Sequence, residues 1–283
     1  MRKYYLTNLW QNEKGIIVEE KAEITALQKQ EIESRFSFVT FYDRCCSIKK
    51  MTKESGNDFM AFCESISKCT AYDPEDADKY HVTANKLLIN YLSFLTMFYD
   101  VVANALSKQK GKDALHKFHE YDSKLYDTYI SYRLLKFCRN YVTHFDIPLT
   151  GLEFGASGII VYAKVNELKR SEKWRKIQND IPIQQERIEM QPHVAQCQKI
   201  IDLLYLNAIE FVFQDAYKGN QELYKLCKQF GLLNPAIVSR DDSNPDNIDI
   251  ANIPLRAFAD YFEDINKSSK YNIHVNYFDV TRP

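Results

Sequence analysis

The scarcity of residues that interrupt regular structure is the strongest constraint on this chain. Only 8 Gly and 8 Pro occur in 283 residues. An all-β sandwich or barrel of this length needs turn residues roughly every 8–12 positions, so this count favours helices. Apolar residues make up 45% and charged residues 27%, the ordinary balance of a globular protein. We therefore expect a folded, mainly α-helical protein.

Charge and hydropathy exclude several classes of protein. The chain has 37 Lys and Arg against 38 Asp and Glu, so it lacks the global basic field of proteins that coat DNA or anionic membranes. The N-terminus has no apolar signal region, and the stretch Leu87–Tyr99 is shorter than the roughly 20 apolar residues of a membrane helix. The seven cysteines contain no C-x-x-C pair. These features predict a cytoplasmic protein with reduced cysteines and no membrane span.

Strand signals are confined to two places. Tyr4–Leu6 and Gly15–Val18 are rich in aromatic and β-branched residues and flank a turn that ends at Gly15, which predicts a hairpin. A second short hairpin is expected over Thr150–Val165, where Ile159–Tyr162 is the clearest strand-like run.

Helical periodicity covers most of the remaining chain. The expected helices are 24–48, 58–68, 84–108, 113–145, 191–217, 221–230 and 255–265, with a loop after residue 234. The two longest are joined by a polar link that contains Gly111, so they should pack antiparallel. The pattern predicts a helical bundle with a small β-hairpin element, divided into an N-terminal strand segment packed on the core (1–22), a helical domain (23–230) and a C-terminal extension with a short helix (231–283).

The end of the second long helix carries the residues of greatest chemical interest: Arg139, Asn140 and His144. At about 100° per residue, Asn140 lies about 40° from His144 around the helix, and Arg133 about 20° from it. Arg139 lies about 140° from His144. Arg139 and His144 therefore converge only if the helix end distorts or a second helix or subunit contributes, which favours a symmetric homodimer.

These residue types suit cleavage of RNA without a metal. The ribose 2′-hydroxyl attacks the adjacent phosphate when a base takes its proton and an acid protonates the departing 5′-oxygen. A histidine serves as acid or base, an arginine binds two phosphate oxygens, and an asparagine orients either partner. DNA lacks the 2′-hydroxyl and is not cut by this route.

The block Arg139-Asn140-Tyr-Val-Thr-His144 resembles the signature of the HEPN superfamily. That signature is an Arg, commonly followed by Asn, Asp or His, and then a His after four to six residues; here four residues intervene. The resemblance covers Ala84 to Leu149, with a weaker likeness onward to about Phe230. It implies a HEPN-like helical bundle, a homodimeric cleft with catalytic Arg139 and His144 and supporting Asn140, and no cofactor. It also implies a toxin or abortive-infection effector against phage, with an antitoxin or defence-system partner.

Other interpretations of the same block remain open. His144 can simply cap the helix, because an imidazolium is favoured at the C-terminal end of the helix dipole, while Arg139 is a solvated charge. The chain would then be a non-catalytic dimeric interaction module or a nucleotide-binding module of a defence system.

A basic segment supports an RNA partner. Residues 164–176 contain six Lys and Arg against two Glu, with an interleaved tryptophan that can stack on bases. The predicted substrate-binding residues are Arg133, Lys169, Arg170, Trp174 and Arg175. A solvated face with local ion pairs is the alternative.

A metal site is not expected. His116 and His119 share a helix face near Asp113 and Glu120, but no third ligand with suitable spacing follows.

Overall fold

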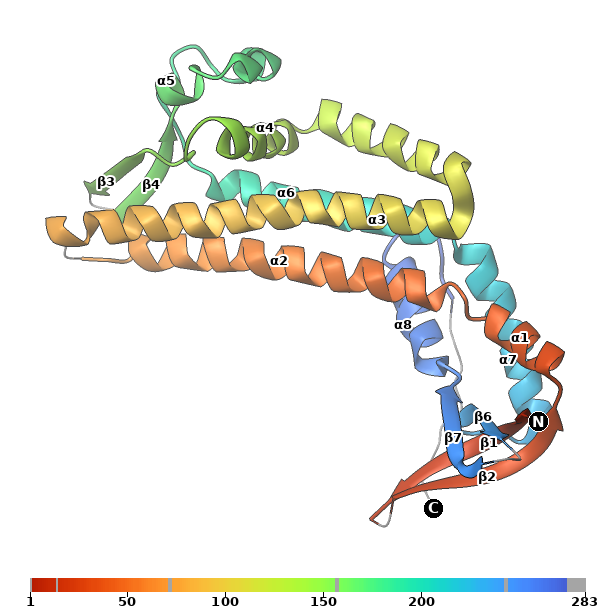
Figure 1. Ribbon diagram of the computed structural model, residues 1–283. Helices are drawn as coiled ribbons and strands as arrows, with labels where there is room; N and C mark the ends of the chain where they lie inside the picture. Colours follow the sequence, from red (N-terminus) through yellow and green to blue (C-terminus); the bar gives the residue numbers. More distant parts are fainter. Residues whose placement is uncertain (1, 14, 71–72, 156–157, 242–243, 274–283) are drawn as a thin grey trace. The chain divides into compact units, whose positions relative to one another are not determined.

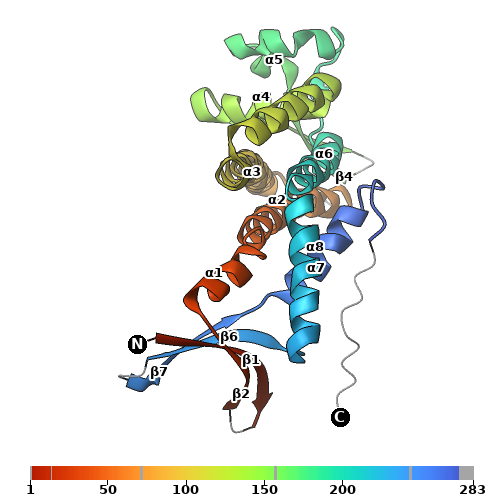
Figure 2. The same cartoon turned by 90° about the vertical axis from the view of Figure 1, so that its right-hand side faces the viewer.

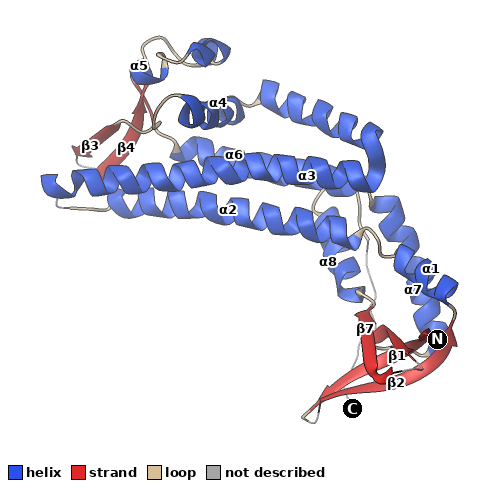
Figure 3. Ribbon diagram, viewed as in Figure 1, coloured by secondary structure: helices blue, strands red, loops and turns tan. Residues whose placement is uncertain are grey.

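The structure is a computed structural model that describes residues 2–13, 15–70, 73–155, 158–241 and 244–273 (Figure 1). It confirms a mainly α-helical chain with two small antiparallel sheets (Figure 3). The α-helices are α1 (Ala26–Ser34), α2 (Val39–Ser67), α3 (Ala77–Thr128), α4 (Ile130–His144), α5 (Val165–Leu168), α6 (Gln191–Glu210), α7 (Phe213–Phe230) and α8 (Leu255–Asn266). The strands are β1 (Arg2–Asn12), β2 (Gly15–Ile24), β3 (Gly151–Gly155), β4 (Gly158–Lys164), β5 (Arg187–Ile188), β6 (Pro235–Asp241) and β7 (Asn244–Asn252). Short 3-10 helices are η1 (Pro74–Asp76), η2 (Glu172–Lys176) and η3 (Gln178–Asp180).

Residue contacts divide the chain into two compact units. Unit 1 consists of Met1–Asp43 and Ile209–Pro283, and unit 2 of Arg44–Ala208. This division differs from the expected boundaries at residues 23 and 231, because strands from both chain ends share one sheet.

Unit 2 is built on helices that run side by side. The part of α2 in this unit lies along α3 and α6 (Figures 1 and 2). Asn90 of α3 donates a hydrogen bond to Ser55 of α2, and Gln198 of α6 donates to Asn57 of α2. Gly56 lies between these contacts, where a Cβ atom would overlap Gln198 and lie 2.9 Å from the Tyr91 ring. The absence of a side chain at Gly56 thus permits the close packing of three helices.

The two long helices pack antiparallel on either side of Gly111, as expected, but the second of them is divided by a break that the sequence did not predict. Gly111, with φ 82° and ψ −172°, turns the chain between the two helical parts of α3 (Figure 1). The expected helix 113–145 is interrupted at Tyr129, whose φ of −113° and ψ of 110° are extended. Arg133 explains this break, because its guanidinium donates to the carbonyls of Tyr126 and Asp127 at 2.7 and 2.6 Å. A side chain from the next helix therefore satisfies the C-terminal carbonyls of α3.

Four other helix predictions are wrong in their boundaries. The expected helices 24–48 and 58–68 are instead α1 and a continuous α2, and the expected helices 191–217 and 221–230 are instead α6 and α7, which divide the chain earlier. The predicted hairpin over Thr150–Val165 is confirmed as β3 and β4, to which the short β5 adds.

Unit 1 contains a four-stranded antiparallel sheet in the order β2-β1-β6-β7. The predicted N-terminal hairpin is confirmed as β1 and β2, and β1 also pairs with β6 through Leu6 and Ile237. The loop expected after residue 234 is therefore wrong. Propensity did not reveal β6 because its partner β1 lies more than 200 residues away in the chain, and β7 in turn pairs with β6.

Aromatic side chains form the helical core of unit 1. Phe38 contacts Phe258 and Tyr261 edge to face, with ring centroids 5.0 and 5.2 Å apart. All three side chains are at most 1% exposed. Part of the high aromatic content therefore serves packing.

Among the described residues, α3 alone is long and apolar enough to cross a membrane by length and composition. Core helices of soluble proteins meet the same criterion, and α3 buries Leu88, Tyr91 and Phe98 in unit 2.

Candidate active site

Helix α4 presents two different sides. Its apolar residues Leu134, Leu135 and Cys138 are fully buried, whereas Arg139 and Asn140 are half-buried. His144 is exposed at the last helical position. This amphipathic pattern places the predicted catalytic residues along the rim of the helix.

Arg139 and Asn140 line one polar pocket. The cavity measures about 360 Å³ and lies between the first half of α3 and α4. Arg139 donates from Nη1 to Oδ1 of Asn140 at 3.3 Å. Lining it are Leu95, Thr96, Tyr99 and Asp100 from α3, and Lys136, Arg139 and Asn140 from α4. The structure thus brings together two of the three predicted catalytic residues.

Lys136 is a pocket residue that the sequence reasoning missed. Its ammonium lies 3.0 Å from Oδ2 of Asp122 and 4.3, 5.0 and 5.6 Å from the ring centroids of Tyr132, Tyr99 and Tyr126. Asp122, only 8% exposed, also accepts a hydrogen bond of 2.6 Å from the Tyr132 hydroxyl. Burial and the Asp122 charge hold the pKa of Tyr132 well above its usual range. A positive charge is therefore fixed in the pocket wall by a carboxylate and three aromatic faces.

A sequence signal for Lys136 existed. Lys136 lies three and four residues before Arg139 and Asn140, and residues at these spacings share a helix face. Tyr132 precedes Lys136 by four residues on α4, whereas Tyr99 and Tyr126 come from α3 and are recognisable only once the two helices pack together.

Tyr99 shapes the opposite wall. Its hydroxyl is hydrogen-bonded to Nδ1 of His119, and its ring stacks on Phe118 at 5.7 Å. Burial, with smaller contributions from Asp122 and Asp100, raises the pKa of Tyr99 to about 12. Tyr99 is thus protonated at neutral pH and supplies a neutral hydroxyl to the pocket.

The two histidines that share a face of α3, His116 and His119, each have a partner within the chain. His119 bonds to Tyr99, and His116 lies 3.5 Å from a Glu120 carboxylate oxygen. In the part of the chain that the structure describes, no group of three or more His, Cys, Asp and Glu is arranged to hold a metal ion.

His144 is not part of the pocket lining. It follows Asn140 by one helical turn and lies about 140° around the helix from Arg139. Phe145 ends the helix, with its backbone N–H donating to the Tyr141 carbonyl at 2.8 Å. The helix end is therefore not distorted in a way that brings His144 to Arg139 within one chain.

The predicted basic segment packs directly on the C-terminal half of α4. The Trp174 ring meets Phe137 edge on at 5.7 Å, and the Tyr141 hydroxyl donates to the Glu167 carbonyl at 3.3 Å. The Arg170 guanidinium lies 5.8 Å from the centroid of the Phe145 ring, next to His144 in the chain. Two regions that the sequence singled out separately are thus neighbours in the structure.

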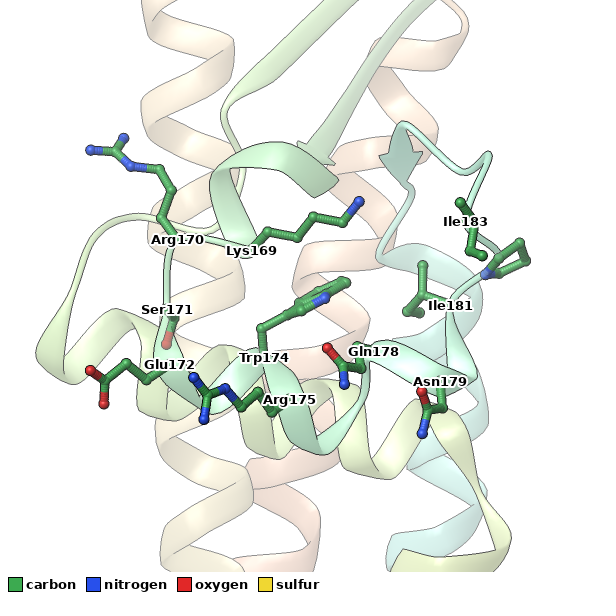
Figure 4. Close-up of a pocket in the computed structure, with 11 residues that line it drawn as sticks. Lys169, Arg170, Ser171, Glu172, Trp174, Arg175, Gln178, Asn179, Ile181 and Ile183 are labelled. Atoms are coloured by element: carbon green, nitrogen blue, oxygen red, sulfur yellow. The ribbon is translucent and has the colours of Figure 1, made fainter.

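The predicted substrate-binding residues divide into different roles. Arg133 bonds Asp180 through two contacts of 2.9 Å besides the α3 carbonyls, so its guanidinium is structural. Trp174 is 6% exposed and is a wall residue, not an open stacking platform. Arg170 pairs with Glu167 at 2.8 Å and remains exposed. Lys169 and Arg175 are exposed beside a second cavity (Figure 4).

Comparison of the chain with protein-family models, with curated proteins and with solved structures finds no match.

Proposed function

We propose that this chain is a metal-independent endoribonuclease. The ribose 2′-oxygen forms a bond to phosphorus, the bond from phosphorus to the 5′-oxygen breaks, and the products end in a 2′,3′-cyclic phosphate and a 5′-hydroxyl. The 2′-hydroxyl proton passes to a base, and the 5′-oxygen receives a proton from an acid. His144 performs one of these transfers, Arg139 stabilises the phosphate charge, and Asn140 orients the guanidinium.

The observation that carries the proposal is the pocket of Arg139, Asn140 and Lys136. Their side chains give N–H donors from one helix to a single cavity of about 360 Å³. Such an arrangement suits the oxygens of a phosphodiester. The neighbouring basic segment, which contacts α4 through Trp174 and Arg170, supplies further positive charge for the flanking strand.

The position of His144 outside the pocket supports a site completed by a second copy of the chain. In a two-fold dimer, Arg139 of one copy and His144 of the other can face the same phosphate. The homodimer is therefore part of the proposal.

Cleavage of total RNA and tRNA with EDTA present tests the activity. Wild-type protein should produce 2′,3′-cyclic phosphate ends, and the variants His144→Ala and Arg139→Ala should not. His116→Ala, which removes another exposed histidine, serves as the control and should cleave like wild type. Cleavage that persists unchanged in His144→Ala and Arg139→Ala would overturn the proposal. No cleavage by wild type would favour the dimeric interaction module.

Mixing two inactive variants tests the composite site. In a dimer of Arg139→Ala with His144→Ala, one of the two composite sites keeps both residues. Random mixing should therefore restore about a quarter of wild-type activity. No restoration would place both residues of each site on one chain.

The resemblance to HEPN proteins extends the proposal to a cytoplasmic toxin or abortive-infection effector, kept inactive by an antitoxin or a defence-system partner. Expression of wild-type protein should then arrest growth of a bacterial host. Expression of His144→Ala at the same level should not arrest growth. Equal growth arrest by both proteins would show that toxicity does not depend on the proposed cleavage.

A further inference from the structure

A second cavity of about 600 Å³ lies in the segment between α5 and β5. Its wall comes from the turn after α5 and from the short helices η2 and η3. Figure 4 shows the Lys169 side chain extending over the Trp174 indole. Gln178 and Ile181 lie beside the indole, and Arg170 points away from it. The volume lies within the usual range of small-molecule sites, about 300–1,000 Å³.

Three kinds of chemical group meet in this cavity. Lys169 supplies a positive charge, Ile183 with the small exposed parts of Trp174 and Ile181 supplies apolar surface, and the amide of Gln178 supplies a donor and an acceptor. Asn179 adds a second amide, and Ile183, 91% exposed, continues the apolar wall at the rim. A ligand that matches all three has an anionic group, a flat apolar face and a hydrogen-bonding edge. Nucleotides have these features.

Both ends of the cavity are attached to α4. Trp174 is held edge on against Phe137, with ring centroids 5.7 Å apart at 77°. Asp180, which ends η3, receives two hydrogen bonds of 2.9 Å from Arg133. The cavity wall is thus positioned before any ligand arrives, which lowers the entropy lost on binding.

We propose that this cavity binds one unpaired nucleotide of an RNA strand, with the base against Ile183 and the exposed part of Trp174, the base edge on Gln178 and the phosphate on Lys169. The identification of the nucleic acid as RNA rests on the proposed ribonuclease function. A base inside a duplex is stacked and paired and cannot enter, so the cavity selects single-stranded segments. Arg133 and Asp180 are positioning residues for this site.

Tryptophan fluorescence reports directly on the cavity. The chain has two tryptophans, so Trp10→Phe leaves Trp174 as the only one. Combining it with His144→Ala removes the proposed catalytic histidine, which allows RNA probes to be titrated. Adenosine 5′-monophosphate should quench Trp174 saturably, whereas adenosine and ribose 5-phosphate should each bind more weakly. A single-stranded RNA decamer should bind more tightly than the same sequence in a duplex.

Matched charge variants separate the cavity from the general basic field. Lys169→Ala should weaken binding of adenosine 5′-monophosphate about tenfold, the factor expected for one charge-assisted hydrogen bond. Lys173→Ala removes the same charge from the same segment but lies outside the lining, so it should change binding less than about twofold. Gln178→Ala should alter the preference among the four common nucleoside monophosphates.

Several results would overturn this inference. They are the absence of saturable quenching in a protein with a native circular dichroism spectrum, equal losses in Lys169→Ala and Lys173→Ala, or ribose 5-phosphate binding as tightly as the nucleotide. The two proposals fail separately. Nucleotide binding without RNA cleavage by the wild type overturns only the ribonuclease, and RNA cleavage without nucleotide binding overturns only the cavity.

Discussion

Two arginines on α4 differ in what their guanidinium groups bind. Arg133 donates to two carbonyls and to both oxygens of Asp180, so it holds α3, α4 and η3 together. Among the described residues, the guanidinium of Arg139 has one hydrogen bond, to Asn140, which leaves most of its five N–H donors for a ligand in the pocket. The positions of the two arginines on α4 did not distinguish these roles in the sequence, because the partners of Arg133 come from α3 and η3.

Gly56 provides a test of packing at the residue scale. Gly56→Ala should lower the free energy of unfolding by about 1–3 kcal/mol, because the added methyl group overlaps Gln198 and approaches Tyr91. Urea unfolding followed by circular dichroism measures the change. Gly155→Ala is the control, since a Cβ there meets no atom within 4 Å. Equal stability of the two variants would show that the helices move apart at no cost.

His193 predicts a pH dependence of stability. Its Nδ1 lies 2.8 Å from the Ser131 hydroxyl, and burial lowers its pKa below the ordinary 6.5. The unfolded chain therefore binds a proton more readily than the folded protein, so stability falls as the pH drops below about 6.5. The urea midpoint should decrease between about pH 7.5 and about pH 5.5, and less so in His193→Gln. His116→Gln, an exposed histidine, should retain the wild-type dependence. The same slope in His193→Gln and wild type would contradict the prediction.

At the scale of elements, the turn within α3 depends on one backbone conformation. Gly111 has φ 82°, a conformation that other residues rarely adopt. A Cβ atom at this position would meet no other atom within 4 Å, so glycine is required by the backbone conformation and not by a lack of space. The polar link and its glycine predicted this turn correctly. The break at Tyr129 was missed because the stabilising contacts come from Arg133, a residue that the helical pattern placed on a ligand-binding face.

Gly111→Ala should destabilise the α3 turn by about 1–3 kcal/mol through backbone strain alone. The melting temperature measures this effect. Lys108→Ala, three residues earlier, exposed and in helical conformation, should change the melting temperature little. If Gly111→Ala had the same melting temperature as the wild type, the chain would have to continue as a straight helix or turn at another residue.

At the scale of the whole molecule, the two ends of the chain are one structural unit. Leu6 is 0% exposed and lies opposite Ile237 in the β1–β6 pairing. The strand β6 therefore depends on residues at the other end of the sequence. This pairing holds β6 in the sheet, and β7 then pairs with β6, so two strands form within residues 235–252, where a loop was expected.

Leu6→Ala should destabilise unit 1 by about 2–5 kcal/mol, the usual cost of truncating a buried leucine. Hydrogen exchange should accelerate in β6 as well as in β1. Leu27→Ala, where the leucine is 65% exposed, is the matched control in the same unit. Unchanged exchange in β6 would contradict the observed pairing.

The sequence by itself determined the helical class, both hairpins, the turn at Gly111 and the last helix, because local periodicity and turn chemistry encode these features. Helical geometry grouped Asn140 with Arg133 and His144 and set Arg139 apart, because adjacent residues lie about 100° apart around a helix. Only the tertiary structure decided that Arg139 and Asn140 line one pocket with Tyr99, that Arg133 is structural, and that Trp174 is buried. Each of these depends on which other element packs against α4, and contacts between residues far apart in the chain leave no local pattern in the sequence.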